Sequence, residues 1–347
     1  MRLLRLFLVV VNGILIAFLF LGFLRQYVEP GFASFLTLFS LLYPYIVISL
    51  FIAMLLLVVV RSKMAWASLL ALVLMSGNTI RQIGFHIQPN IPQNSTIYSL
   101  TTLNVKNNFR HQDQDQSKVF VQKFKSNPST YMVLQEISGD LIQQIANDLN
   151  YPYHSHLENP RMGGDLAIFS LHPLSNVQPL QNPDRRMIAL SADVESPLGT
   201  FRLVNIHLHT NAVTVRAGKF SPESFSRREG LKAFGEMLQS YNDNAKLRLK
   251  EIDLIYQVVN QSPHPVVIAG DANDTPYSPV YLKLRDDRQN AFVKGGVGFA
   301  QTYNGLLIPL KIDHIFMDKS FNIYNTLIEK IDFSDHNPIT TSFTIQN

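Results

Sequence analysis

The sequence predicts an α/β protein of packed β-sheets covered by helices, preceded by a membrane region. Beyond residue 98, short β-rich runs alternate with helical stretches, which is typical of sheets with helices packed on them. An all-β sandwich would leave the long helical stretch near 222–260 unexplained. Apolar runs long enough for membrane helices fill most of the first 80 residues. We therefore expect a membrane region over 1–81, a linker over 82–98 and a soluble domain over 99–347.

Composition and charge restrict the class of protein further. With 347 residues, 46% of them hydrophobic, the chain is long enough to bury a substantial core. Because it holds no cysteine, it has neither a thiolate zinc site nor a cysteine nucleophile. The chain has 30 basic and 26 acidic residues. Six basic residues and one acidic residue lie in residues 1–81, which leaves 24 basic and 25 acidic residues for the rest of the chain. The soluble domain therefore lacks the positive charge typical of tight binding to long nucleic acids.

Two apolar segments open the chain. Residues 3–24 are nearly uncharged and would form a helix about 33 Å long, enough to cross the bilayer core. The sequence RQYVEPG follows without a small-residue cleavage site, so we interpret this segment as a retained helix and not as a signal peptide. Residues 32–60 form a longer run, in which Pro44 is expected to kink the helix.

A third apolar segment decides which side of the membrane holds the soluble domain. Residues 64–80 would make a short span, and an interfacial helix is the alternative interpretation. Three spans would put four basic residues in the cytoplasm and two outside, in agreement with the positive-inside rule. The four are Arg2, Arg5, Arg61 and Lys63, and the two are Arg25 and Arg81. We expect three spans and an extracytoplasmic domain, whereas two spans would make the domain cytoplasmic.

The elements of the soluble domain follow from runs of β-branched and aromatic residues and from helical periodicity. The clearest predicted strands are 99–105, 131–136, 165–170, 187–194, 201–208, 265–271, 312–317 and 339–345. The predicted helices are 116–126, 138–149 and 222–260. The last helix carries mixed charges that include Arg248 and Glu251, which we interpret as a solvated face.

Polar residues with catalytic chemistry lie at or just beyond the ends of these strands, where loops place side chains over a rigid sheet. They are Asn104, Glu136, His207, Asp271, Asn273, Asp313, Asp335 and His336. Taken singly, each has an ordinary structural interpretation as a helix cap, a turn former or a hydrogen-bonded histidine. The complete order N…E…H…DxN…D…DH is hard to obtain by chance, and it predicts one site built from several strand ends.

This ordered set resembles the endonuclease/exonuclease/phosphatase superfamily, which includes deoxyribonucleases, abasic-site endonucleases, neutral sphingomyelinases and inositol-phosphate 5-phosphatases. The most specific motifs are GDAND (271 is its first aspartate) and SDH (334–336), with QE (135–136) upstream. The resemblance covers about residues 99–345 and implies a four-layer α/β sandwich, two facing mixed sheets flanked by helices. The N-terminal part is similar to a membrane-anchored bacterial branch, which implies an integral protein of the bacterial inner or plasma membrane.

The resemblance also implies a metal-dependent hydrolase of phosphate esters. A hard divalent cation neutralises charge on the phosphoryl oxygens, and Mg²⁺ takes only one or two protein carboxylates. By resemblance, Glu136 is the principal metal ligand with Asn104 beside it, and Asp335 contributes to the same or a second ion. Mg²⁺ is the expected cofactor, with Mn²⁺ as the alternative.

The same resemblance suggests roles for the remaining polar residues. Asp271 and Asn273 would face the attacking water and a phosphoryl oxygen, and His207 would contact a phosphoryl oxygen or the leaving group. His336 is the expected general base, and Asp313 would accept the N–H of its other ring nitrogen. Asp271 is the alternative base.

These observations lead to one expected function and two alternatives. We expect a phosphodiesterase anchored in the lipid bilayer, and the near-neutral domain beside a membrane favours a lipid headgroup as substrate, with Arg161 as a candidate phosphate contact. The first alternative is an extracytoplasmic nuclease acting on DNA or RNA, since overall charge can hide a local basic groove. The second, a catalytically inactive binding module, is disfavoured because every catalytic position is filled. Two positions depart from the family pattern: Ala272 replaces an aromatic residue, and Asn290 replaces an aspartate.

Overall fold

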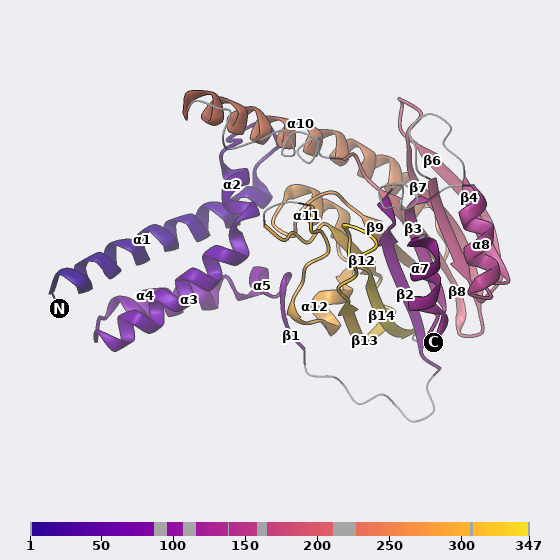
Figure 1. The fold of residues 1–347 in the computed structure, drawn as a ribbon, viewed down its shortest axis with the longest axis horizontal. Helices are drawn as coiled ribbons and strands as arrows, with labels where there is room; N and C mark the ends of the chain where they lie inside the picture. The colour runs from indigo at the N-terminus through magenta and orange to yellow at the C-terminus, as the bar shows by residue number, and fades with distance from the viewer. Residues whose placement is uncertain are drawn as a thin grey trace.

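The structure, a computed structural model, describes residues 2–86, 96–106, 116–137, 139–157, 165–210, 227–305 and 308–345. Arg161 lies outside the described residues. Figure 1 shows two parts, a bundle of helices that projects from one side and a larger domain of sheets and helices.

The helices of the N-terminal part run toward the domain, away from it and back. They are α1 (Arg2–Leu24), η1 (Arg25–Tyr27), α2 (Leu36–Leu41), α3 (Tyr43–Val59), α4 (Met64–Leu74) and α5 (Ser76–Thr79). The N-terminus and the turn between α3 and α4 lie at the far end of the bundle, whereas the C-terminal end of α1 and helix α5 lie on the domain side (Figure 1).

The apolar segment 32–60 differs from the single kinked helix that the sequence predicts. The chain leaves α2 at Leu42 and begins α3 at Tyr43, so Pro44 occupies the first turn of a new helix. A proline is tolerated there, because the first turn of a helix has no internal acceptor for its N–H group. By length and composition, one described helix, Arg2–Tyr27, is able to cross a membrane, and two shorter apolar helices cover Tyr43–Val59 and Met64–Leu74.

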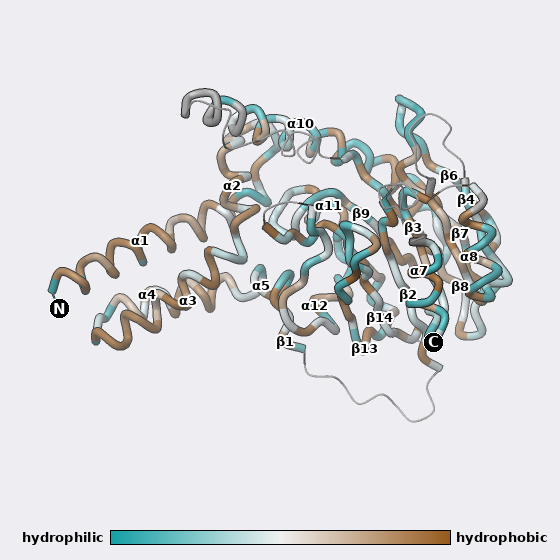
Figure 2. The backbone as a smooth tube through the Cα atoms, viewed as in Figure 1, coloured by the Kyte–Doolittle hydropathy of each residue, from teal (hydrophilic) through white to brown (hydrophobic). Residues whose placement is uncertain are grey.

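Helices α1, α3 and α4 are apolar along most of their length, as their brown colour shows (Figure 2), and the bundle is apolar on its outside as well as within. Large apolar side chains such as Phe7, Phe51 and Leu70 are exposed on the three helices. Inside, the Ser68 hydroxyl donates a buried 2.6 Å hydrogen bond to Asn12 Oδ1 and so links α4 to α1. Such a surface is unfavourable in water, and it is typical of helices in a lipid environment.

Two six-stranded mixed sheets form the larger domain. The first has the order β13-β14-β2-β3-β5-β4 and the second the order β10-β12-β9-β8-β7-β6. The strands of the first are β2 (Tyr98–Asn104), β3 (Tyr131–Ile137), β4 (Tyr153–Leu157), β5 (Asp165–Ser170), β13 (Phe321–Ile328) and β14 (Ile339–Ile345). Those of the second are β6 (Leu174–Gln181), β7 (Met187–Ser196), β8 (Gly199–His207), β9 (Val266–Asp271), β10 (Gln289–Asn290) and β12 (Asp313–Met317).

The sheets face each other across one apolar core and carry helices on their outer faces. Val133 of β3, Leu203 of β8 and Val267 of β9 belong to the buried cluster between the sheets. Helices α7 (Gln116–Lys125) and α8 (Asp140–Asp148) cover the first sheet, and α10 (Arg227–Val259) and α11 (Pro279–Arg285) cover the second. The expected four-layer sandwich is therefore confirmed.

All eight predicted strands and all three predicted helices are present, with ends within a few residues of those expected where the structure describes them; residues 222–226 of the third predicted helix lie outside the described residues. Strands β4, β6 and β13 were not predicted: His154 and Pro179 interrupt the first two, and β13 loses its alternation where its register shifts between Ile323 and Asn325. The strands at 83–85, 289–290 and 297–299, of two or three residues each, were not predicted either, because so short a run carries no pattern. The solvated face expected on the helix near 222–260 is wrong for Arg248 and Glu251, which are buried against the second sheet.

The bundle is joined to the domain by specific contacts. The ring of Tyr43 stacks on Tyr277, with centroids 4.2 Å apart. The buried Arg25 donates from Nη2 to Asn242 Oδ1 of α10 at 3.0 Å. Strand β1 (Ile83–Phe85) pairs with β11 (Val297–Phe299), which follows the short helix α12 (Ala291–Gly295). The start of the expected linker is therefore part of a small sheet.

Candidate active site

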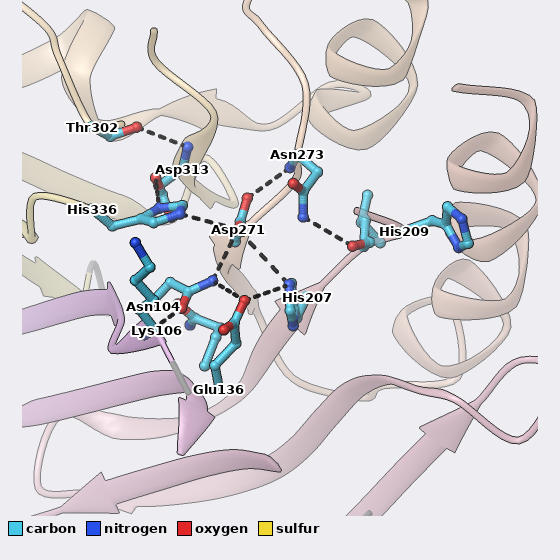
Figure 3. A network of polar contacts seen from close by, with 12 residues as sticks. Asn104, Lys106, Glu136, His207, His209, Asp271, Asn273, Thr302, Asp313 and His336 are labelled. Carbon is cyan, nitrogen blue, oxygen red and sulfur yellow. Dashed lines mark hydrogen bonds and ion pairs between the residues drawn. The ribbon is translucent and has the colours of Figure 1, made fainter. Parts of the chain in front are cut away.

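The ends of four strands bring the predicted polar residues to one edge of the sandwich. Parallel strands β2 and β3 of one sheet deliver Asn104 and Glu136, and parallel strands β8 and β9 of the other deliver His207 and Asp271. Because parallel strands end at the same edge of a sheet, all four side chains converge there. Asp313 opens β12 and pairs in register with Asp271, so it joins the same edge (Figure 3).

An amide lies between two carboxylates at the centre of the site. Asn104 Nδ2 donates to Glu136 Oε1 at 3.0 Å and to Asp271 Oδ2 at 3.2 Å. His207 Nε2 lies 3.7 Å from Glu136 Oε1 and 3.9 Å from Asp271 Oδ2. Asn104 Oδ1 accepts the backbone N–H of Lys106, which leaves one lone pair of that oxygen for another partner.

A histidine–aspartate pair faces this centre from the other side. His336 Nδ1 lies 2.9 Å from Asp313 Oδ2, and His336 Nε2 lies 3.8 Å from Asp271 Oδ2. The backbone N–H of Asp313 donates to the Thr302 hydroxyl, and the His336 ring lies 4.9 Å from that of Tyr303. These contacts fix the ring so that its Nε2 atom points into the site (Figure 3).

The GDAND loop turns sharply beside these groups. Gly270 has φ +143°, and a Cβ atom there would lie 2.1 Å from the carbonyl oxygen of Ile206, so only glycine fits. Asn273 has φ +52°; its N–H donates to Asp271 Oδ1, and its Nδ2 donates to the carbonyl oxygen of Leu208. Asn273 thus holds Asp271 and the end of β8 in position through these two hydrogen bonds.

Asp335 lies toward the rim, and the central residue Glu136 is partly exposed. Asp335 Oδ2 forms a 2.8 Å ion pair with Lys106 Nζ, and both side chains are partly exposed. Glu136 sits in the left-handed region with φ +57° and keeps one fifth of its side chain exposed. A glutamate held in this conformation stores strain, which functional sites commonly tolerate.

Burial and mutual charge change the proton affinities of the central groups. Burial and the nearby Arg186 hold the pKa of His207 well below its usual value. Burial and the Asp313 carboxylate raise the pKa of Asp271 to about 7. Burial alone would lower the pKa of His336, but the bonded Asp313 and the carboxylates of Asp271 and Asp335 outweigh it and raise this pKa to about 10.

Sequence reasoning missed an ion pair that supports the end of β8. Arg186 is buried; it donates to the backbone carbonyls of His207 and Leu208 and pairs with Glu251 Oε1 at 3.2 Å. Glu251 also accepts the N–H of His209 at 2.7 Å. No sequence motif marks these residues, since Arg186 follows a turn and Glu251 is one of many charges on α10.

A second missed network holds the GDAND loop. Asp274, fully buried, accepts both Nε and Nη2 of Arg248 and also the hydroxyl of Tyr241. The Nε2 atom of His314 lies 3.1 Å from the backbone oxygen of Asp274. The signal available in the sequence was the second aspartate of GDAND, which stands directly after the predicted catalytic residues.

The donor set fits a divalent cation. Glu136 and Asp271 offer carboxylate oxygens on either side of Asn104, and one ligand atom each of Asp271, Asp313 and His336 lie within 4.8 Å of one another. His207 Nε2 and Asp313 Oδ1 are buried without a hydrogen-bond partner in the described part of the chain. Buried polar atoms of this kind are expected to meet a ligand, an ion or water.

Comparisons with known proteins agree with this site. The model of the endonuclease/exonuclease/phosphatase family matches residues 101–336, more than half of the chain, and the protein therefore belongs to that family. Family members are metal-dependent hydrolases of phosphoester bonds, and the chain is an enzyme of this class. A second model, for a domain of unknown function (DUF8431), matches residues 4–82. Among curated proteins the comparison finds no match.

Several solved structures share the fold. An endonuclease/exonuclease/phosphatase protein from Beutenbergia cavernae superposes with a TM-score of 0.51 at 17% identity, covering 72% of each chain. The 3′ phosphatase NExo from Neisseria, bound to product DNA hairpin, gives 0.53 at 14% identity, covering 71% of this chain and 99% of its own. The human Nocturnin catalytic domain superposes with a TM-score of 0.52 at 13% identity, covering 72% of this chain and 95% of its own. At these identities the likeness concerns the fold.

Proposed function

We propose that the protein is a membrane-anchored phosphodiesterase that uses Mg²⁺, with Mn²⁺ as the alternative ion. The observation that carries the proposal is the convergence of Glu136, Asn104 and Asp271 opposite the His336–Asp313 pair. Carboxylate and amide oxygens are the ligands that Mg²⁺ prefers, and few of them are needed because Mg²⁺ retains several waters. We assign Glu136 as the principal ligand with Asn104 beside it.

Asp335 has a conditional role in this assignment. Its Oδ2 atom is paired with Lys106 at the rim, so its Oδ1 atom would be the one that contributes to metal binding while that ion pair is closed. The proximity of Asp271, Asp313 and His336 offers another possible set of ligands. We assign His336 and Asp313 to proton transfer instead. A hydrogen bond from one ring nitrogen to a carboxylate is the usual means of orienting a catalytic histidine.

The proposed reaction is hydrolysis by in-line attack of water on phosphorus. The water oxygen forms a bond to phosphorus while the bond from phosphorus to the leaving oxygen breaks. His336 Nε2 takes the proton of the water, because Asp313 holds Nδ1; Asp271 is the alternative acceptor. His207 Nε2 would contact a phosphoryl oxygen or the leaving oxygen. When bound, the cation would neutralise charge on the phosphoryl oxygens and offset the field of the carboxylates around His336.

The substrate that we favour is a phosphodiester of a lipid headgroup. The domain outside residues 1–81 carries 24 basic and 25 acidic residues, and the bundle to which it is joined has an apolar outer surface. Near-neutral charge does not suit the many phosphate contacts of long nucleic acids, whereas a membrane presents headgroups at high local concentration. Nuclease activity is the second candidate, favoured by the structural likeness to NExo, whose structure contains product DNA hairpin.

Hydrolysis by the full chain in detergent tests this proposal. The substrates are sphingomyelin and phospholipid micelles, inositol phosphates, and single-stranded and duplex DNA, each with Mg²⁺ and with EDTA. We expect Mg²⁺-dependent headgroup release that falls at least about 10³-fold in Glu136→Gln and His336→Ala, but not in His156→Ala, an exposed control. DNA cleavage with the same dependence would favour the nuclease, and full activity in both variants would refute the catalytic assignment.

A further inference from the structure

A cavity lined by several charged side chains lies between the helical bundle and the domain, away from the active site. Its volume is about 330 Å³, and its walls come from Gly77 of α5, Arg81, the C-terminal part of α11, and Lys294 of α12. Strand β12 separates it from the catalytic groups, since Asp313 begins the strand at the active site and Lys319 follows its other end at the cavity. None of the proposed catalytic residues lines it.

The cavity has an excess of positive charge. Five basic residues line it against one acidic residue, Asp287. Asp287 pairs with Lys319 at 2.9 Å, and Asp318 pairs with Arg288 at 2.8 Å. The three other basic residues, Arg81, Arg285 and Lys294, have no carboxylate within ion-pair distance among the described residues. Burial lowers the pKa of Arg81, and the Arg285 guanidinium acts in the same direction, as expected when like charges face one space.

Hydrogen-bond donors in the walls also lack partners. Arg285 Nε, Asn290 Nδ2 and the Tyr281 hydroxyl are buried without a hydrogen bond to any described residue. Asn290 and Tyr281 are 3% and 1% exposed, so bulk water does not compensate them. The orientation of Asn290 is fixed, because its Oδ1 accepts the N–H groups of Phe292 and Val293. The remaining polar group of Asn290, its Nδ2, is therefore a hydrogen-bond donor. An aspartate at this position would have added negative charge to the cavity instead.

We propose that this cavity binds the phosphate of an anionic phospholipid headgroup. Arg285, Lys294 and Asn290 would supply charge and hydrogen bonds, which is the donor set that recognises phosphate. A lipid is favoured over free phosphate because α5, which provides Gly77, directly follows the apolar helix α4 and lies on the domain side of the bundle. This assignment rests on the proposed membrane anchoring, and it is independent of the chemistry at Glu136.

The test measures binding of short-chain phosphatidylglycerol to the full chain in a neutral detergent. The variant Arg285→Gln/Lys294→Gln removes two of the unpaired charges, and Lys232→Gln/Lys330→Gln removes two exposed charges elsewhere. We expect roughly 25-fold weaker binding in the first variant and a change of less than about twofold in the second, because each basic group near an anionic lipid contributes about fivefold. Phosphatidylcholine of equal chain length should bind much more weakly.

Other outcomes of the same experiment overturn the proposal. Equal weakening in both variants, or none in either, would show that the cavity is not the site. Inorganic phosphate or a short oligonucleotide that binds as tightly, with the same loss in Arg285→Gln/Lys294→Gln, would overturn the lipid assignment. Hydrolysis by this variant, measured in parallel, should stay within about twofold of the parent, so that failure here and failure of the proposed function remain distinguishable.

Discussion

At the scale of single residues, some side chains of the candidate site hold other side chains in position, and Asp313 is the clearest case. Asp313 has one oxygen on His336 Nδ1 and is itself held by the Thr302 hydroxyl. If it only orients and stabilises the imidazole, Asp313→Asn should lower kcat by roughly 10²- to 10³-fold and leave KM nearly unchanged. Steady-state kinetics check this expectation, with the exposed Asp253→Asn as the control. A rise in KM with kcat retained would mean that Asp313 binds substrate instead.

A buried histidine next to the site predicts a pH dependence of stability. Burial, with Lys311 nearby, lowers the pKa of His314 to about 3, whereas an unfolded histidine has a pKa of about 6.5. Below pH 6.5 the unfolded chain takes up a proton that the folded chain refuses, so stability falls as the pH decreases from 6.5 toward 3, by up to about 1.4 kcal/mol per pH unit. Above pH 6.5 this contribution is constant.

Thermal unfolding between pH 7 and pH 5 checks this prediction. The unfolding temperature of His314→Gln should fall less steeply with decreasing pH than that of the parent. Some pH dependence should remain in this variant, because burial also lowers the pKa of His207. His156→Gln, at an exposed position, should reproduce the slope of the parent. Identical slopes in all three proteins would mean that His314 takes up its proton in the folded state.

The candidate site was largely predictable at this scale because its residues close strands. Asn104, Glu136, His207 and Asp271 stand at strand ends, and their order carried the resemblance to the family. Arg186 was not predictable in the same way. Its partners are the backbone carbonyls at the end of β8 and a carboxylate on α10, and such pairings depend on tertiary packing and leave no spacing in the sequence.

At the scale of elements, helix α10 holds the GDAND loop as well as covering a sheet. Arg248 and Asp274 are both fully buried, with Arg248 Nη2 2.8 Å from Asp274 Oδ2. Asp274→Ala would leave the guanidinium buried without its counter-charge, and loss of one partner of such a pair costs about 3–5 kcal/mol. We expect a marked drop in the unfolding temperature and loss of activity.

Two variants show whether this loss comes from the buried ion pair. Arg248→Met/Asp274→Leu removes both charges, so it should be more stable than Asp274→Ala, since a buried pair replaced by apolar groups is often tolerated. Lys246→Ala changes an exposed charge on the same helix and should have little effect. A double variant no more stable than Asp274→Ala would locate the cost in the packing of the loop.

The elements themselves were predictable to different degrees. Buried strands such as β9, a run of apolar residues closed by Gly-Asp, identify themselves by composition. Strand β6 is mostly exposed and contains Pro179, so nothing in its local sequence requires a strand. Its strand conformation depends on its pairing with β7. Helix α10 was predicted, but its buried charges were assigned to solvent because helical periodicity does not reveal what packs against a polar face.

At the scale of the whole molecule, the bundle and the domain form a connected unit. Tyr277, which stacks on Tyr43, lies three residues after Asp274, the last residue of the GDAND loop, and Arg81 donates to the carbonyl oxygen of Pro276 between them. The position of the bundle is thus linked through short contacts to the residues beside Asp271. The sequence predicted both parts, but the contact between Tyr43 and Tyr277 joins residues more than 200 positions apart and has no local signal.

The path of the helices gives the last prediction, the orientation of the molecule in a membrane. The N-terminus and the turn at 61–63 lie together at the far end of the bundle, and they carry Arg2, Arg5, Arg61 and Lys63. The basic residues at the domain end, Arg25 and Arg81, are hydrogen-bonded to the protein. Since positive charge stays in the cytoplasm, we expect the far end to be cytoplasmic and the catalytic domain to be extracytoplasmic.

Labelling of introduced cysteines decides the orientation, and the chain suits it because it has no cysteine of its own. Lys330→Cys is exposed on the domain and Lys63→Cys is exposed at the far end of the bundle. A membrane-impermeant maleimide applied to spheroplasts should label Lys330→Cys at once and Lys63→Cys only after the membrane is opened. The reverse pattern would place the domain in the cytoplasm, and labelling of both without opening would mean that the bundle does not cross the membrane. Only the expected pattern gives the active site access to substrates in the outer leaflet or beyond it.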